Sequence, residues 1–136
     1  MAAYYQEEVK FYVSVDCIIF GFDKNELYVL LYKRTFEPLK GHWSLMGGFI
    51  KSGESVNDAA SRVLTECTGI KDLFMEQVGA YGDVTRDIGE RVISIAYFAL
   101  VNMGCRSFLH HHCHYHRLLY LLLVITTRNI SIRRQH

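Results

Sequence analysis

The chain has 136 residues, 50% hydrophobic and 21% charged, a composition that fits one compact globular domain and leaves no room for two. Its formal net charge of +1 neither favours nor excludes a polyanionic partner. The longest apolar run, Leu118 to Ile125, is too short to span a bilayer, and the four cysteines show no paired spacing. With no N-terminal signal pattern, we expect a cytoplasmic protein with reduced thiols and no membrane contact.

Two strands are predicted first. Residues 9–22 alternate in hydrophobicity, with Tyr12, Ser14 and Asp16 opposite an apolar face of Phe11, Val13, Val15, Cys17 and Ile19. A turn cluster at 23–25 precedes a second strand at 27–34, so the two strands are expected to form a hairpin.

A loop at 35–41 leads to a short apolar segment, 43–50, which Gly47 and Gly48 interrupt. A helix is expected from Ser55, which resembles the start of a capping box with Asp58, to Gly69 as its C-terminal stop. Strands at 74–81 and 92–101 follow, separated by a polar loop. This order predicts a mixed α/β sheet.

The segment from Gly41 to Ile70 reads GHWSLMGGFIKSGESVNDAASRVLTECTGI. It closely resembles the Nudix (MutT-like) signature: a glycine, five residues, a glutamate, seven residues, then Arg-Glu-apolar-x-Glu-Glu-x-Gly-apolar. The residues that match at the correct spacing are Gly48, Glu54, Arg62, Leu64, Glu66, Gly69 and Ile70. The resemblance covers roughly residues 10–101 and implies a Nudix α/β/α sandwich with a mixed sheet.

Nudix enzymes cleave a diphosphate linked to a nucleoside, usually with Mg²⁺ or Mn²⁺, and such hard cations need clustered oxygen ligands. The resemblance makes Glu54, Arg62 and Glu66 the catalytic candidates, and Glu54, Glu66 and the Gly48 carbonyl the metal-ligand candidates. However, two signature glutamates are replaced by Val63 and Cys67. We therefore expect Mg²⁺ to bind weakly or not at all.

Structural alternatives stay open at these positions. Glu54 and Arg62 either contact a ligand or form a salt bridge that ties the loop to the helix, and Glu66 is either a ligand or a solvated residue. Val63 and Cys67 fit core packing, although a thiolate ligand for a soft metal is a further option at Cys67. Glycines 47, 48 and 69 are expected to serve backbone geometry, because glycine allows positive φ.

Residues 85–97 are similar to a stretch in one Nudix branch, which contains ADP-ribose-type hydrolases and degenerate Nudix domains fused to a DNA-binding winged helix. The resemblance suggests phosphate contacts from Arg86 or Arg91, against the alternative of a solvated charged loop. Lys33 and Arg34 are further phosphate candidates. Gly47 and Gly48 complete the candidate ligand site.

The chain changes character near residue 104. Residues 1–104 hold 10 Lys/Arg and all 14 Asp/Glu, whereas residues 105–136 hold five Arg, no acid and six of the seven His. We expect an incomplete Nudix domain at 1–104 and an atypical tail at 105–136. A frameshift or truncation is the favoured explanation of the tail; a Zn²⁺-binding tract at His110–His116 and a basic tail for nucleic acid or membrane surfaces are the alternatives.

Two functions follow from the resemblance. The favoured one is a binding module that senses a nucleoside-diphosphate-type ligand such as ADP-ribose or a nucleotide sugar, within a regulator whose DNA contacts come only from a winged-helix domain absent from this sequence. The alternative is an active Mg²⁺-dependent pyrophosphohydrolase of ADP-ribose-like substrates. A homodimer is also expected, because many Nudix relatives form one.

Overall fold

The computed structural model describes residues 2–24, 26–102, 120–125 and 130–134. In the described part of the chain, neither helix has the length and hydropathy needed to cross a lipid bilayer. The elements in chain order are α1 (Ala2–Gln6), β1 (Tyr12–Asp23), β2 (Glu26–Lys33), β3 (Trp43–Ser44), β4 (Met46–Phe49), α2 (Val56–Thr68), β5 (Glu76–Tyr81), β6 (Val92–Asn102), β7 (Tyr120–Ile125) and β8 (Ile130–Arg134).

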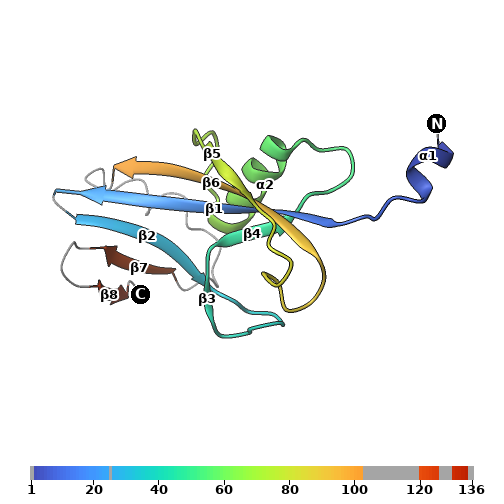
Figure 1. Cartoon of the computed structure of the whole chain (residues 1–136). Helices are drawn as coiled ribbons and strands as arrows, with labels where there is room; N and C mark the ends of the chain where they lie inside the picture. Colours follow the sequence, from blue (N-terminus) through green and yellow to red (C-terminus); the bar gives the residue numbers. More distant parts are fainter. Residues whose placement is uncertain (1, 25, 103–119, 126–129, 135–136) are drawn as a thin grey trace.

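One mixed sheet organises the molecule, in the order β5-β6-β1-β2-β7-β8 (Figure 1). Strands β1 and β6 run parallel from Tyr12↔Val92 to Phe22↔Asn102, and the other pairs are antiparallel. The expected mixed α/β sheet is therefore confirmed.

The sheet forks along β1. Near its carboxyl end, β1 pairs with β2, from Phe20↔Val29 to Asp23↔Glu26. Near its amino end, β4 pairs with β1 instead, from Ser14↔Phe49 to Cys17↔Met46, while β3 pairs with the end of β2. The segment predicted as one interrupted strand at 43–50 thus becomes two short strands on different neighbours, and this divergence opens space beside β1.

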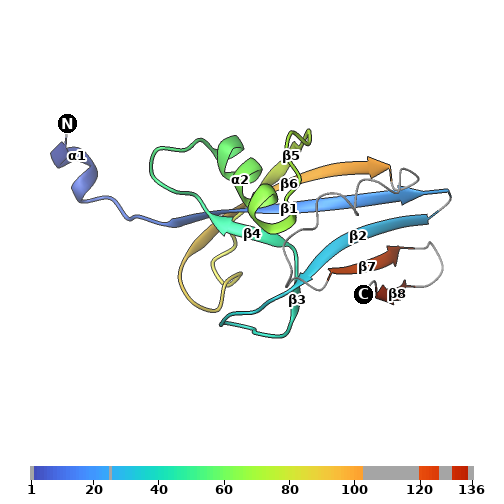
Figure 2. The same ribbon diagram turned by 180° about the vertical axis from the view of Figure 1, so that it is seen from behind.

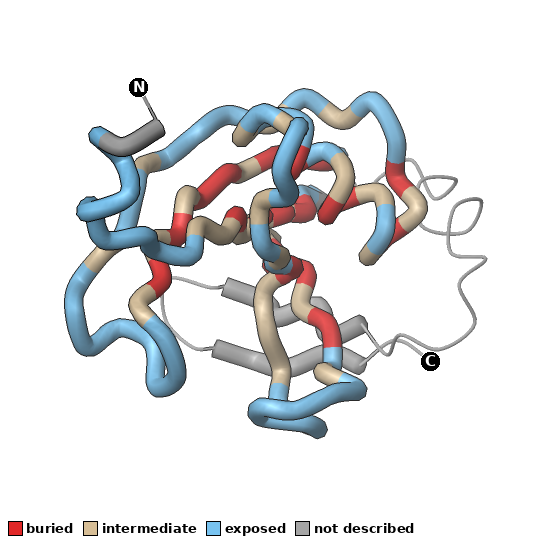
Figure 3. The backbone as a smooth tube through the Cα atoms, turned by 90° about the vertical axis from the view of Figure 1, so that its right-hand side faces the viewer, coloured by how far each residue is buried: buried red, intermediate tan, exposed pale blue. Residues whose placement is uncertain are grey.

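Helix α2 covers one face of the sheet, as the view from behind shows (Figure 2). The alternation of β1 sends Val15, Cys17 and Ile19 toward a buried core that also contains residues of α2 (Figure 3). Cys17 illustrates the contact, because its thiol donates to the Ala60 carbonyl at 3.5 Å. The opposite face of β1 presents Tyr12, Ser14 and Asp16, as the sequence predicted.

Two predicted strand boundaries were wrong at their amino ends. Strand β1 begins at Tyr12 instead of Val9, and Phe11, expected on the buried face, is 47% exposed because it precedes the paired residues. Likewise β5 begins at Glu76 rather than Phe74, whose side chain is 81% exposed. Both predictions followed the apolar residues of the sequence. The strands themselves begin later, at the first residues that pair with a neighbouring strand.

Strands β7 and β8 extend the sheet beyond β2, with β7 paired from Leu27↔Ile125 to Tyr32↔Tyr120. The histidine-rich segment 110–116 lies outside the described residues. For the apolar run 118–125, the burial of the side chains is likewise not described. The expectations for a metal-binding, basic or frameshifted tail therefore stay predictions.

Candidate functional site

Helix α2 is fixed by its caps. Ser55 and Asp58 form a reciprocal capping box, with the Ser55 hydroxyl accepting from the Asp58 amide at 3.1 Å. Gly69 closes the other end in the left-handed region at φ 74°, where its amide donates to the Thr65 carbonyl at 2.8 Å. Both predicted helix ends are confirmed, and together they fix the side chains that α2 presents to the preceding loop.

Arg62 of α2 holds that loop in place. Its guanidinium donates to both carboxylate oxygens of Glu54, at 2.9 and 2.7 Å, and to the Phe49 carbonyl at 2.9 Å. A fourth bond, at 3.2 Å, reaches Glu66 one helical turn away. The predicted salt bridge between the loop and the helix is therefore present, and a single cation binds both carboxylates that remain from the signature.

The Arg62 guanidinium and the Lys51 amide lower the pKa of Glu54 from 4.5 to about 2. A carboxylate with a depressed pKa stabilises the folded state above its unfolded pKa, and this contribution disappears as the pH falls from 4.5 toward 2. We expect Glu54→Gln to lower the melting temperature at pH 7, and the gap from the wild type to close on acidification over this range. Thermal denaturation across pH 2 to 7 measures it. A gap that does not vary with pH would show that the ion pair is not its cause.

The two replaced signature positions offer little to a hard cation. Val63 is 2% exposed and belongs to the hydrophobic core, and the half-buried Cys67 packs against that core. Burial raises the pKa of the Cys67 thiol, with Glu66 adding to the shift, so the thiol stays protonated at neutral pH. The packing alternative is thus the one that the structure supports at both positions.

The carboxylates that remain from the signature already have hydrogen-bond partners within the protein. Both oxygens of Glu54 already accept hydrogen bonds from Arg62, and one of them also accepts from the Lys51 amide at 2.7 Å. Glu66 shares the same guanidinium. Across the described ranges, no group of three His, Cys, Asp or Glu side chains is placed to hold a metal ion. A hard cation would therefore compete with the Arg62 guanidinium for these two carboxylates.

Gly47 and Gly48 have an explanation other than positive φ, which neither residue adopts. A Cβ at Gly47 would lie 2.5 Å from Asp16 Oδ1, and a Cβ at Gly48 would lie 2.8 Å from a methyl group of Val63. The expectation based on left-handed backbone was therefore wrong for these two glycines and right for Gly69. Strand β4 needs glycine because both of its sides are closely approached.

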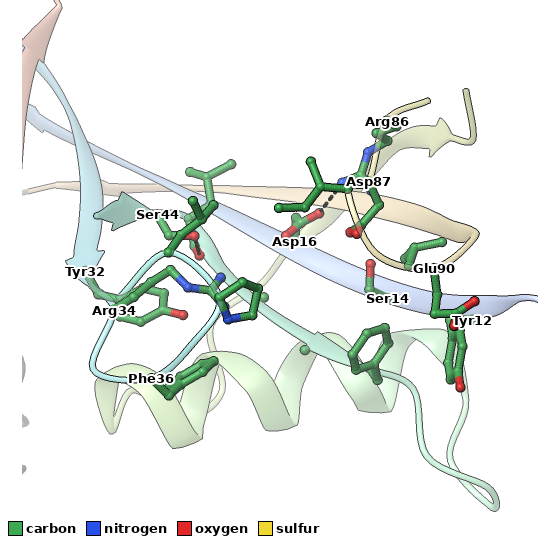
Figure 4. A pocket seen from close by; sticks show the side chains of 18 residues that line it. Tyr12, Ser14, Asp16, Tyr32, Arg34, Phe36, Ser44, Arg86, Asp87 and Glu90 are labelled. Carbon is green, nitrogen blue, oxygen red and sulfur yellow. Dashed lines mark hydrogen bonds and ion pairs between the residues drawn. The ribbon is translucent and has the colours of Figure 1, made fainter. Parts of the chain in front are cut away.

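A cleft of about 750 Å³ opens at the fork of the sheet, on the face of β1 opposite α2 (Figure 4). Its wall is formed by β1, the end of β2, β3 and β4, the loop after β2 and the loop before β6. The lining residues are Tyr12, Ser14, Asp16, Tyr32, Arg34, Phe36, Pro38, Leu39, Ser44, Leu45, Gly47, Gly48, Phe49, Arg86, Asp87, Ile88, Glu90 and Val92. Its size and mixed polarity suit a small organic ligand.

Arg34 brings a cation to one end of this cleft. Its guanidinium carbon lies 4.8 Å from the centre of the Phe36 ring, and its buried Nε has no hydrogen-bond partner within the described part of the chain. A buried donor without an acceptor is costly, and the guanidinium to which it belongs is a cation in the cleft lining, where it favours an anionic ligand. Arg34 is thus the predicted phosphate contact that the geometry favours most.

Arg86 lies on the opposite side of the cleft, where it donates to the Asp16 carboxylate at 3.3 Å. The Ser94 hydroxyl donates to the same oxygen of Asp16. Arg91 lies elsewhere: it donates to the Gly82 carbonyl and stacks on Phe11 at 5.4 Å. The structure therefore brings Arg34, Gly47, Gly48 and Arg86 together at the cleft, and leaves Arg91, Lys33, Glu54, Arg62 and Glu66 outside its lining.

Comparison with known proteins gives a consistent result. The profile described as NUDIX domain matches residues 10–105. The chain is 37% identical over 92 residues to the ADPR responsive transcriptional repressor NtrR of Acinetobacter baylyi, covering 66% of this chain and 37% of the repressor. It is 38% identical over 85 residues to the ADP-ribose pyrophosphatase of Methanocaldococcus jannaschii, covering 62% of this chain and 48% of that enzyme.

Among solved structures, Shewanella oneidensis NrtR superposes with a TM-score of 0.67 at 27% identity, over 80% of this chain and 51% of that one. The chain therefore spans about half the length, or less, of these relatives. The NUDIX match at residues 10–105 includes the residues of the cleft lining and of α2.

Proposed function

Because this chain belongs to the NUDIX family, we propose that it binds a nucleoside diphosphate of the ADP-ribose type in the cleft at the sheet fork, as an effector sensor rather than an efficient hydrolase. Two observations carry the proposal: Arg62 binds both remaining signature carboxylates, and Arg34, which lines the cleft, has a buried Nε with no hydrogen-bond partner among the described residues. The first feature disfavours catalysis by metal ions, and the second favours capture of an anion.

The relatives support the ligand class but do not choose between binding and cleavage. One responds to ADPR as a repressor and the other is an ADP-ribose pyrophosphatase, and their identities to this chain are almost equal, at 37% and 38%. The residues at the signature helix therefore decide. Valine at 63 and cysteine at 67 supply no charge to a cation, so we propose that Mg²⁺ is bound weakly or is absent.

Slow Mg²⁺-dependent hydrolysis is the second candidate, favoured by the retention of Glu54 and Glu66. Were it correct, these two carboxylates and the Gly48 carbonyl would hold the cation after Arg62 had moved aside. The cation would neutralise the phosphate oxygens, the chemistry that such a site supplies.

One pair of measurements separates the candidates. We expect isothermal titration calorimetry to show ADP-ribose binding that persists in EDTA. Chromatographic assays for AMP and ribose 5-phosphate, the two products of cleaving the diphosphate, should show no turnover with Mg²⁺. A ligand that binds only the folded state raises the melting temperature. A melting temperature that does not rise with millimolar ADP-ribose would therefore contradict the sensor proposal. Turnover that Glu66→Gln abolishes would establish the hydrolase instead.

A regulator also needs a DNA-binding part and often a second subunit. We propose that DNA contacts belong to a separate winged-helix domain, and that two copies of this chain associate. Operator DNA added to this chain alone should therefore produce no mobility shift.

A further inference from the structure

The cleft contains two half-exposed aromatic rings at the end away from Arg34. Tyr12 is 55% exposed and Phe49 is 56% exposed, and their ring centres lie 5.6 Å apart at an interplanar angle of 54°. They come from neighbouring strands, because Phe49 pairs with Ser14, two residues along β1 from Tyr12. Large rings left in water inside a concave site commonly mark the surface on which a flat apolar group is bound.

The cleft is polar along its length between these rings and Arg34. In Figure 4, Tyr12 and Glu90 lie at one end, Arg34 and Phe36 lie at the other, and Ser14 and Asp16 lie between them. On the exposed face of β1, the order is therefore an aromatic ring, a hydroxyl and a carboxylate. Hydroxyl and carboxylate oxygens accept hydrogen bonds from sugar hydroxyls, and the guanidinium at the far end suits phosphate oxygens.

Phe36 is a less suitable platform, although it is also exposed. The Arg34 guanidinium already lies over its ring at 4.8 Å. Anionic phosphates drawn to that guanidinium would occupy the same end of the cleft. Glu90, which lies beside Tyr12 in Figure 4, repels phosphate from the other end, where a neutral ring is tolerated.

We propose that Tyr12 and Phe49 form a nucleobase subsite, so that the ligand lies along β1 with its base on these rings and its phosphates at Arg34. This inference rests on the proposed function and adds a requirement to it: a base-free sugar phosphate binds more weakly than the matching nucleotide. Aromatic side chains stack on bases whatever the base identity, so the subsite selects for a base without specifying which one.

The test compares AMP with ribose 5-phosphate, which differ by the adenine, in the Tyr12→Leu/Phe49→Leu variant and the wild type. We expect the variant to bind AMP and ADP-ribose about tenfold more weakly, because stacking is lost, while its affinity for ribose 5-phosphate is unchanged. Phe74→Leu is the matched control, since Phe74 is 81% exposed and lies outside the cleft lining. The conservative Phe49→Tyr, which keeps a π-face, should bind as the wild type does.

Equal losses for AMP and ribose 5-phosphate would mean that the substitutions disturb the cleft in general, and unchanged AMP binding would mean that the base lies elsewhere; either result overturns the subsite. Size-exclusion chromatography of the same proteins adds a further check. A dimer that dissociates in the variant, with AMP binding intact, would assign the two rings to a subunit contact. Failure of the wild type to bind ADP-ribose at all would instead remove the proposed function on which the subsite depends.

Discussion

Val63→Glu, which restores the first missing signature glutamate, is expected to destabilise the fold by roughly 2–5 kcal/mol rather than to create an enzyme. Val63 is 2% exposed, and one of its methyl groups lies 2.8 Å from the position that a Cβ on Gly48 would take. A longer, charged side chain must either displace β4 or remain as an uncompensated anion in an apolar layer. Urea denaturation followed by circular dichroism measures the loss.

Val63→Gln is the matched control, because it has nearly the same size and no charge. Burial raises the pKa of a carboxyl group, so the deficit of Val63→Glu relative to Val63→Gln should shrink as the pH falls from neutrality and the group becomes protonated. Equal stability of the two variants at pH 7, together with stabilisation by Mg²⁺, would show that position 63 opens onto a cation site after all.

Arg34→Gln is expected to weaken ADP-ribose binding by roughly ten- to a hundredfold, the effect of losing a charge-assisted hydrogen bond to phosphate. The fold should remain stable, since the wild-type Nε is buried with no acceptor among the described residues. Calorimetry at fixed ionic strength gives the change in affinity, and the melting temperature without ligand reports on folding.

Lys33→Gln is the control that separates a direct hydrogen bond from Arg34 to the ligand from a general attraction between positive charge and phosphate. Lys33 is adjacent, exposed and absent from the cleft lining, so its loss removes the same charge from nearly the same place. We expect less than a threefold change in affinity, with most of it suppressed by salt. Equal losses in both variants would mean that net charge, and not a bond from Arg34, attracts the ligand.

The sequence predicted the elements whose signals are local. Alternation along β1, the capping box at Ser55 and the glycine after Thr68 each depend on a few neighbouring residues, and each prediction was confirmed. The loss of signature carboxylates could also be recognised from the sequence, through its resemblance to the Nudix signature. By contrast, the sequence did not show why glycine is needed at positions 47 and 48. The close neighbours there are Asp16 and Val63, which are distant from these glycines in the chain.

Most of the cleft could not be predicted either. Tyr12, Ser14 and Asp16 were placed on one face of a strand, but nothing in a single strand shows that β4 would replace β2 beside it. Phe36 and Phe49 looked like ordinary apolar residues of a loop and a short strand. The contact of Arg62 with the Phe49 carbonyl crosses thirteen positions of the chain and has no motif of its own.

Phe49 contributes both to the cleft and to the anchoring of helix α2. Its ring is part of the cleft wall, while its carbonyl oxygen accepts a hydrogen bond from Arg62 on the far side of the same strand. Because Gly47 and Gly48 precede Phe49, β4 has no side chains at these two positions, and only its backbone separates the cleft from α2 there. A displacement of β4 from the cleft side would therefore also move the carbonyl oxygen to which Arg62 of α2 donates.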